Sequence, residues 1–204
     1  MRKIWKRLVL CLCMPAVIWG ITLILQKQLL QKELIRFHVV ANSDTPQDQE
    51  VKLRVRDAVL KYLREDLQQL NNAEEAKIYL TETLPFIQSV AKETLESAGF
   101  FDSVTVSLCR EEFDIREYDT FTLPSGVYES LRIVIGEGQG HNWWCVTFPN
   151  FCMPAVSEDF EDVAAGAGFS EKLIQTLGDK ETYEIRFYLL DVLGRLENIL
   201  HTSE

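Results

Sequence analysis

The chain begins with a basic segment followed by a long uncharged one, and this order limits where the rest can fold. Residues 2–7 carry four positive charges, and Leu8–Leu25 contains no charged side chain in eighteen positions. A bilayer core is crossed by about 17–25 apolar residues, whereas the apolar part of a cleaved secretory signal has about 7–15. Residues 1–26 are therefore predicted to be a signal peptide or, because no small-x-small cleavage site follows, an uncleaved signal-anchor.

The distribution of charge predicts that the remainder of the chain is exported. Basic residues beside an apolar segment stay on the cytoplasmic side, so residues 33–204 are expected to form a globular domain outside. The alternative, a buried core helix, explains the basic flank less well. Seventeen of the 21 basic residues and all 31 acidic residues follow Arg7. This acidic excess argues against nucleic acid and anionic lipid headgroups as partners.

Hydrophobic periodicity predicts a mixture of strands and long helices in the exported part. Pro85 is expected to kink or split the second long helix, and Gly99 to end it. Residues 113–123 and 152–168 are expected to be irregular. The fold class is therefore α+β (or α/β), a small mixed sheet packed with two long helices plus a C-terminal helix. The expected strands are 34–41, 103–109, 128–136 and 143–148, and the expected helices are 46–70, 73–98, 170–177 and 183–200.

The glycine-rich sequence GEGQG at 136–140 resembles a phosphate-binding loop only superficially. Its glycine spacing differs from the dinucleotide fingerprint, and no helical pattern opens after it. A helix N-terminus is what gives such loops their affinity for anions, and Glu137 would repel phosphate. A hairpin-like turn between two strands is the better interpretation.

Two tryptophans and two cysteines follow this bend. Neighbours on an extended strand point to opposite faces, so at most one of Trp143 and Trp144 is displayed on a given face and the other is expected in the core. A displayed aromatic side chain is a typical contact in protein interfaces. In an exported protein Cys145 and Cys152 are candidates for a disulfide. The alternative is that both are reduced and buried.

The sequence offers two weak candidates for chemistry. His141 lies four residues before Cys145, which on an extended chain separates them by roughly 13 Å, too far for a nucleophile and its base. His38, Asp44 and His141 could supply metal ligands, but no close two-ligand spacing of the zinc kind occurs. The residues around Asn42 and Asp44 are explained equally well as turn and helix-cap chemistry. No catalytic residue, metal or cofactor is therefore predicted.

Three segments together resemble the stage II sporulation protein R family. They are IRFHVVANSD at 35–44, QDQEVKLRVRDAVL at 47–60 and LPSGVYESLRIVIGEGQGHNWWCVTFPNFC at 123–152. The pattern NWWCV-x-FP-x-x-C is uncommon and therefore specific. The resemblance covers residues 35–152 well and the C-terminal part loosely, with departures at Asn150 and in the loop after Met153.

The resemblance implies a non-enzymatic signalling protein of endospore formers. Such proteins are made in the forespore and exported into the space between the forespore and mother-cell membranes, free or membrane-anchored. There they activate a membrane-embedded aspartic protease of the mother cell, which processes the precursor of the early sigma factor. The expected partners are this protease and, through residues 8–25, the membrane, with no nucleic acid and no small-molecule substrate. The candidate contact residues are Trp143, Trp144, Phe148, Phe151, Asn42 and Asp44.

A second hypothesis is a cell-envelope enzyme, for instance a cysteine peptidase or wall hydrolase that uses Cys145 with His141 or His38. The oxidation state of Cys145 and Cys152 separates the two hypotheses, because a disulfide would remove the nucleophile.

Overall fold

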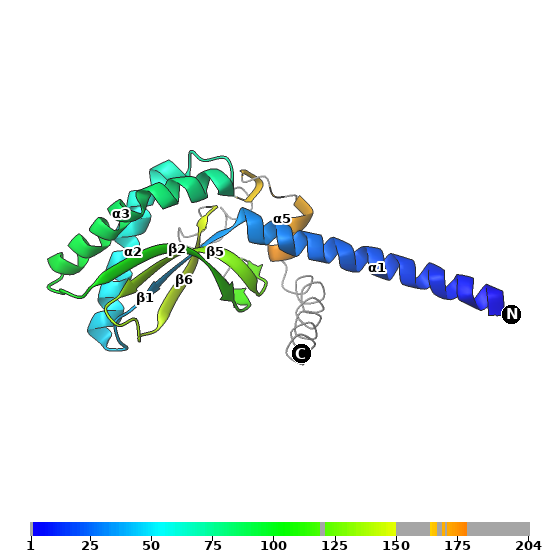
Figure 1. Ribbon diagram of the computed structural model, residues 1–204, viewed down its shortest axis with the longest axis horizontal. Helices are drawn as coiled ribbons and strands as arrows, with labels where there is room; N and C mark the ends of the chain where they lie inside the picture. Colours follow the sequence, from blue (N-terminus) through cyan, green and yellow to red (C-terminus); the bar gives the residue numbers. More distant parts are fainter. Residues whose placement is uncertain (1, 119–120, 150–163, 167–168, 170, 179–204) are drawn as a thin grey trace.

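The computed structural model describes residues 2–118, 121–149, 164–166, 169 and 171–178. It is a mixed α+β structure, which confirms the predicted fold class. Helix α1 projects away from a sheet that α2 and α3 cover (Figure 1). The helices are α1 (Arg2–Glu33), α2 (Pro46–Leu67), α3 (Ala73–Ser97) and α5 (Glu171–Gly178), and the strands are β1 (Ile35–Val40), β2 (Val104–Phe113), β3 (Arg116–Glu117), β4 (Thr122–Leu123), β5 (Gly126–Ile135) and β6 (Asn142–Phe148).

The main sheet has the strand order β2-β5-β1-β6. Strand β1 lies parallel to β5 and antiparallel to β6, and β2 lies antiparallel to β5. The chain therefore leaves β5, crosses the end of β1 and returns as β6 on its other side. The predicted hairpin at 136–140 is wrong, because β5 and β6 are not neighbours. Both loops that follow β1 and β5 consequently lie at the same end of the sheet.

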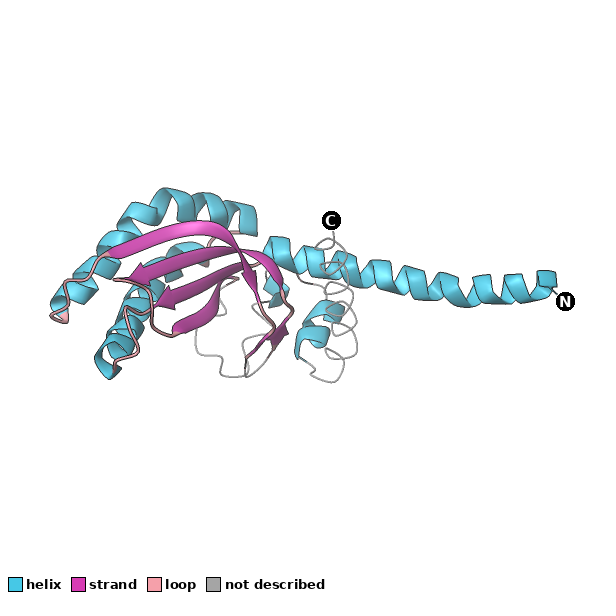
Figure 2. Cartoon of the chain, turned by 60° about the horizontal axis from the view of Figure 1, so that its bottom comes forward, coloured by secondary structure: helices cyan, strands magenta, loops and turns pink. Residues whose placement is uncertain are grey.

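The two sheet faces carry different side chains. Helices α2 and α3 cover one face (Figure 2), here called the helix-side face. Its core includes Phe37 and Leu131, which are fully buried with the apolar residues of both helices. The opposite face, the second face, contributes Tyr128 and Val146 to a separate cluster that also contains residues of α1, α5 and the β3–β4 ribbon. One face packs on helices and the other on a mixed set of elements.

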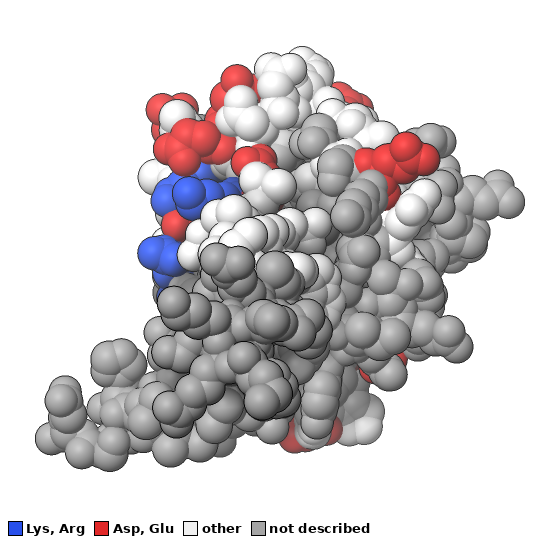
Figure 3. Space-filling model, turned by 90° about the vertical axis from the view of Figure 1, so that its right-hand side faces the viewer, with Lys and Arg blue, Asp and Glu red and all other residues white. Residues whose placement is uncertain are grey.

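Helix α1 enters the domain without a linker. Its last residue is Glu33, and β1 begins at Ile35. Leu30 and Leu34 are fully buried in the cluster on the second face. Among the described residues one helix, Cys13–Glu33, has the length and apolarity to cross a membrane, which signal sequences also have. Seen from the side on which α1 projects, the described surface shows charged side chains mainly at its margins (Figure 3).

Most element boundaries agree with the sequence pattern. Thr45 caps α2 by accepting a hydrogen bond from the Asp48 N–H, and Pro46 occupies the first turn. Gly99 ends the α3 region with a φ of 84°. Pro85 does not split α3, which runs unbroken as one helix. The segment expected to be irregular contains the end of β2 and the short β3–β4 ribbon. The predicted helix at 183–200 lies outside the described residues.

Candidate functional site

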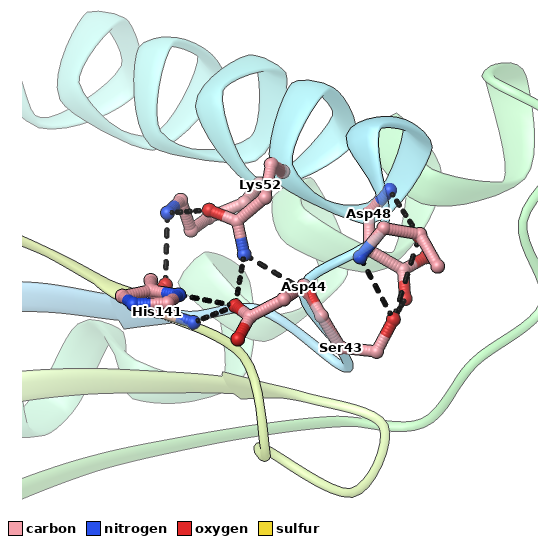
Figure 4. Close-up of polar contacts among 7 residues, drawn as sticks. Ser43, Asp44, Asp48, Lys52 and His141 are labelled. Carbon is pink, nitrogen blue, oxygen red and sulfur yellow. Dashed lines mark hydrogen bonds and ion pairs between the residues drawn. The ribbon is translucent and has the colours of Figure 1, made fainter.

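Two loops meet at the end of the sheet opposite α1, and we call this region the distal pole. It consists of residues 41–45 after β1, residues 136–141 after β5 and the first turns of α2 (Figure 4). Strands β1 and β5 are parallel, so their carboxyl ends share this edge. The residues come from positions almost a hundred apart in the chain, and only the parallel pairing brings them together.

Backbone hydrogen bonds join the two loops. The amides of Gln139 and Gly140 donate to the carbonyl oxygens of Asn42 and Ala41, at 3.1 and 3.0 Å. The Asn42 side-chain oxygen accepts from the Glu137 amide at 3.0 Å. These three loop amides are thus satisfied by the partner loop, which holds both loops in one arrangement.

The close approach of the two loops explains why glycine occurs in the bend at 136–140. A Cβ atom at Gly140 would lie 2.3 Å from the backbone oxygen of Ser43, a neighbour that cannot rotate away. Gly136 has a φ of 57°, and a Cβ atom there would meet the Asn42 side chain at 2.2 Å. The glycines therefore serve contact between loops, and no phosphate-binding role is needed to account for them.

Asp44 and His141 form the centre of the distal pole. The Asp44 Oδ1 atom accepts from the His141 backbone amide at 2.7 Å and from the His141 Nδ1 atom at 2.5 Å. These bonds hold the pKa of the Asp44 carboxyl below its ordinary range. The His141 side chain is 82% exposed. Its Nδ1 is engaged, so the Nε2 edge faces outward and can exchange a hydrogen bond with a partner.

Two charged residues behind this pair are buried. Lys52 is 5% exposed, and its Nζ donates to the His141 carbonyl oxygen at 2.8 Å. Burial lowers the pKa of the Lys52 ammonium. Asp48 accepts hydrogen bonds from Ser43 and Asn42, and the bond from Ser43 is the main reason that the pKa of Asp48 is lowered. Both charges are used internally, so the exposed carboxylates at the pole are Asp44 and Glu137.

The aromatic segment starts beside the distal pole and divides between the two faces. Trp143 packs against the helix-side core, with Phe37 at a centroid distance of 5.9 Å and the Arg56 guanidinium 4.7 Å above its ring. Trp144 stacks on His38 at 4.7 Å on the second face. Both indoles are half-buried, so neither is wholly core nor wholly displayed. Phe148 is 5% exposed and belongs to the helix-side core, which removes its ring from the accessible surface.

The proposed cysteine chemistry does not assemble among the described residues. Cys145 is buried, and its thiol lies 3.7 Å from the Val146 carbonyl oxygen. No described hydrogen bond joins Cys145 to a histidine, since His141 bonds Asp44 and His38 bonds Glu111. Phe151 and Cys152 lie outside the described residues, so the disulfide with Cys145 stays a prediction. No group of three or more metal-ligating side chains occurs in the described parts of the chain.

Sequence reasoning identified Asn42, Asp44 and His141 but not their joint arrangement. It also assigned no role to Lys52, which is buried and donates to the His141 carbonyl oxygen. Likewise, nothing in the sequence predicted the contact of His38 with Glu111, 2.7 Å apart. One signal for the burial of Lys52 was available in the sequence. Lys52 lies between Val51 and Val55, which occupy the buried side of α2.

Comparison with known proteins gives the family. The family model for stage II sporulation protein R matches residues 31–158. The chain is 32% identical over 190 residues to stage II sporulation protein R of Bacillus subtilis strain 168, covering 84% of each chain. No solved structure matches. The matched range contains both loops of the distal pole and the aromatic segment. The chain therefore belongs to the stage II sporulation protein R family.

Proposed function

We propose that this protein is an exported signalling ligand that activates a membrane-embedded aspartic protease in the facing mother-cell membrane. The protease then processes the precursor of the early mother-cell sigma factor. Membership of the sporulation family carries this proposal. The ligand acts by binding the active arrangement of the protease more tightly than the inactive one, because only differential affinity shifts a conformational equilibrium. It performs no chemistry of its own.

The attachment of α1 supports presentation of the distal pole to a partner. The helix continues into β1 without a linker, and Leu30 is buried against the domain. Strand β1 then runs away from α1 for six residues before it reaches Ala41. If α1 is held in the forespore membrane, the pole is the part of the domain that faces the opposite membrane (Figure 1).

The receptor contact that we propose combines the distal pole with Trp143. The exposed His141 lies two residues before the half-buried Trp143, and Asp44 of the neighbouring loop is bonded to His141. The Arg56 guanidinium covers one face of the Trp143 indole. A half-buried, rigidly held indole is a suitable anchor, because little side-chain entropy is lost when it is covered.

Co-expression in a heterologous host tests this function. The full chain, the protease and its precursor substrate are produced together, and cleavage of the precursor is measured. Processing is expected only with all three present. Trp143→Ala is expected to reduce processing more than Trp144→Ala at equal amounts of folded protein. Absence of processing with the native chain would reject the activation mechanism.

The compartment is tested separately. A reporter that is active only outside the cytoplasm, fused after Glu204, is expected to be active in the producing cell. Activity of a cytoplasmic reporter at the same position would reject export.

A further inference from the structure

The second face holds a cluster of charged and polar side chains away from the distal pole. In the sheet register Arg36 lies beside Ser130, and His38 lies beside Arg132. Glu111 reaches this group from β2. Its Oε2 atom is 2.7 Å from His38 Nε2, and its Oε1 atom accepts from Arg132 Nη1 at 3.1 Å. Neither the receptor contact nor the helix-side core uses these five residues.

Unsatisfied polar atoms concentrate in this cluster. Seven buried side-chain nitrogen or oxygen atoms in the described parts of the chain lack a hydrogen-bond partner. Five of the seven belong to this cluster, namely two of Arg36 and one each of His38, Ser130 and Arg132. Buried polar groups are nearly always paired in folded proteins, so five unpaired atoms on the adjacent strands β1 and β5 indicate a place where a ligand completes the bonding.

Within the described part of the chain, the positive charge of the cluster exceeds the negative charge. Arg36 is fully buried, and its only described hydrogen bond goes to the Tyr118 hydroxyl at 3.1 Å. The rings of Phe113 and Tyr128 contact its guanidinium but supply no negative charge. Glu111 balances one of the two arginines, and burial lowers the pKa of His38, which keeps this imidazole neutral. Among the described residues of the cluster one positive charge is left over, and burial of an unpaired charge is costly.

We propose that this cluster binds a monocarboxylate, such as the C-terminal carboxylate of a peptide. The free nitrogens of Arg36 and Arg132 and the Ser130 hydroxyl are donors suited to carboxylate oxygens. The His38 Nε2–H is donated to Glu111, so the unpaired Nδ1 accepts, as from the amide N–H next to a peptide carboxylate. The stacked Trp144 indole forms the wall beside His38. A single negative charge neutralises the site, whereas phosphate, at about −1.5 to −2, would exceed it.

The rim of the cluster is open to solvent. The Arg132 side chain is 42% exposed and that of Glu111 is 22% exposed, while His38, Ser130 and Arg36 form the buried floor. A ligand therefore meets Arg132 first. This makes Arg132 the residue whose loss should affect binding most with least damage to the fold.

Histidine resonances provide a direct test, because the chain has three histidines. The full-length protein in detergent micelles is labelled with ¹³C at histidine Cε1 and titrated with N-acetylglycine. We expect a saturable shift of the His38 signal and none of the exposed His141 signal. N-acetylglycinamide, the neutral analogue, and inorganic phosphate should produce no comparable shift. An equal response to either of these, or no saturable shift of His38, would overturn the proposal.

Three variants complete the test. Arg132→Gln is expected to weaken the affinity for N-acetylglycine at least tenfold. Arg110→Gln removes the same charge from β2 but at a position that faces the helix side, and should leave the affinity unchanged. Glu111→Gln removes the competing carboxylate and is expected to strengthen binding, so it tests the proposal even if Arg132→Gln does not fold. Unchanged affinity in both cluster variants would contradict it.

Discussion

The two faces of the sheet place side chains of comparable burial in very different surroundings. Phe37 and Arg36 are adjacent on β1, and both have no solvent exposure. Phe37 faces a core of apolar side chains that it shares with α2 and α3. Arg36 faces aromatic rings, one tyrosine hydroxyl and unpaired polar atoms. Equal burial therefore does not mean an equal contribution to stability.

The difference separates what maintains the fold from what is available for binding. Apolar burial contributes about 25 cal/mol per Å², and the sheet residues that face α2 and α3 are part of an apolar cluster. On the second face the desolvation of Arg36 and His38 opposes the same hydrophobic gain. Residues retained despite such a cost are candidates for function. Four substitutions test this contrast, and they are ordered by the expected change in stability.

Phe37→Ala is expected to be the most destabilising. It empties a fully buried site in the helix-side core and removes the contact with Trp143. Loss of a buried phenylalanine typically costs about 3–5 kcal/mol. Urea unfolding of the purified variant, followed by circular dichroism, measures the change. A loss of less than about 1 kcal/mol would show that this face packs loosely.

Arg36→Met is expected to change stability much less, although Arg36 is equally buried. Replacement of a buried charge by an apolar side chain of similar size is often neutral or even stabilising, by about 1–4 kcal/mol. The lost contacts with Phe113, Tyr128 and the Tyr118 hydroxyl act in the other direction. The free energy of unfolding should therefore stay within about 2 kcal/mol of the native value.

The same urea experiment decides this second case. A loss as large as that of Phe37→Ala would mean that the guanidinium stabilises the second face, and the contrast between the faces would fail. A small loss of stability in Arg36→Met, together with abolished binding of N-acetylglycine, would strengthen the contrast between the two faces.

His38→Gln is expected to alter the pH dependence of stability. Burial lowers the pKa of His38 below its ordinary value, despite the opposing effect of Glu111. The folded state therefore binds a proton less readily than the unfolded state does. The contribution of neutral His38 to the free energy of unfolding is fully present above the unfolded pKa of about 6.5. It is lost as the pH falls from there toward the lower pKa of the folded state.

Stability of the native chain should consequently decrease between pH 7.5 and 5.5, with a slope from this residue of at most about 1.4 kcal/mol per pH unit. The slope should be smaller in His38→Gln, and thermal unfolding across this range measures both proteins. A steeper slope in the variant would show that Glu111 outweighs burial, and that His38 is charged in the folded state.

The sequence predicted the helix-side face better than the second face, for physical reasons. Period-two alternation in β1 and helical spacing in α2 both report burial against another apolar surface. Local periodicity does not show which strands pair with each other. The bend at 136–140 was therefore wrongly predicted to be a hairpin, although β1 lies between β5 and β6. Asp44 and His141 were considered together only as possible metal ligands, and their hydrogen bond to each other requires β1 and β5 to be parallel neighbours. The cluster around Arg36 has no local pattern at all, because its members come from three strands.

Asp44→Asn is expected to have the smallest effect on stability and a marked effect on signalling. The carboxylate is exposed, so solvent screens its bonds with His141. Its pKa is lowered by those bonds, so its contribution is present above the ordinary carboxyl pKa and is lost as the pH falls through the lower folded value. The thermal midpoints of native and variant chains should converge in acid.

Glu50→Gln, which removes an exposed carboxylate paired with Arg54 on α2, is the matched control. If the distal pole contacts the protease, Asp44→Asn should reduce precursor processing while Glu50→Gln should not. Equal processing by both variants would place the receptor contact elsewhere, with the activation mechanism itself still intact.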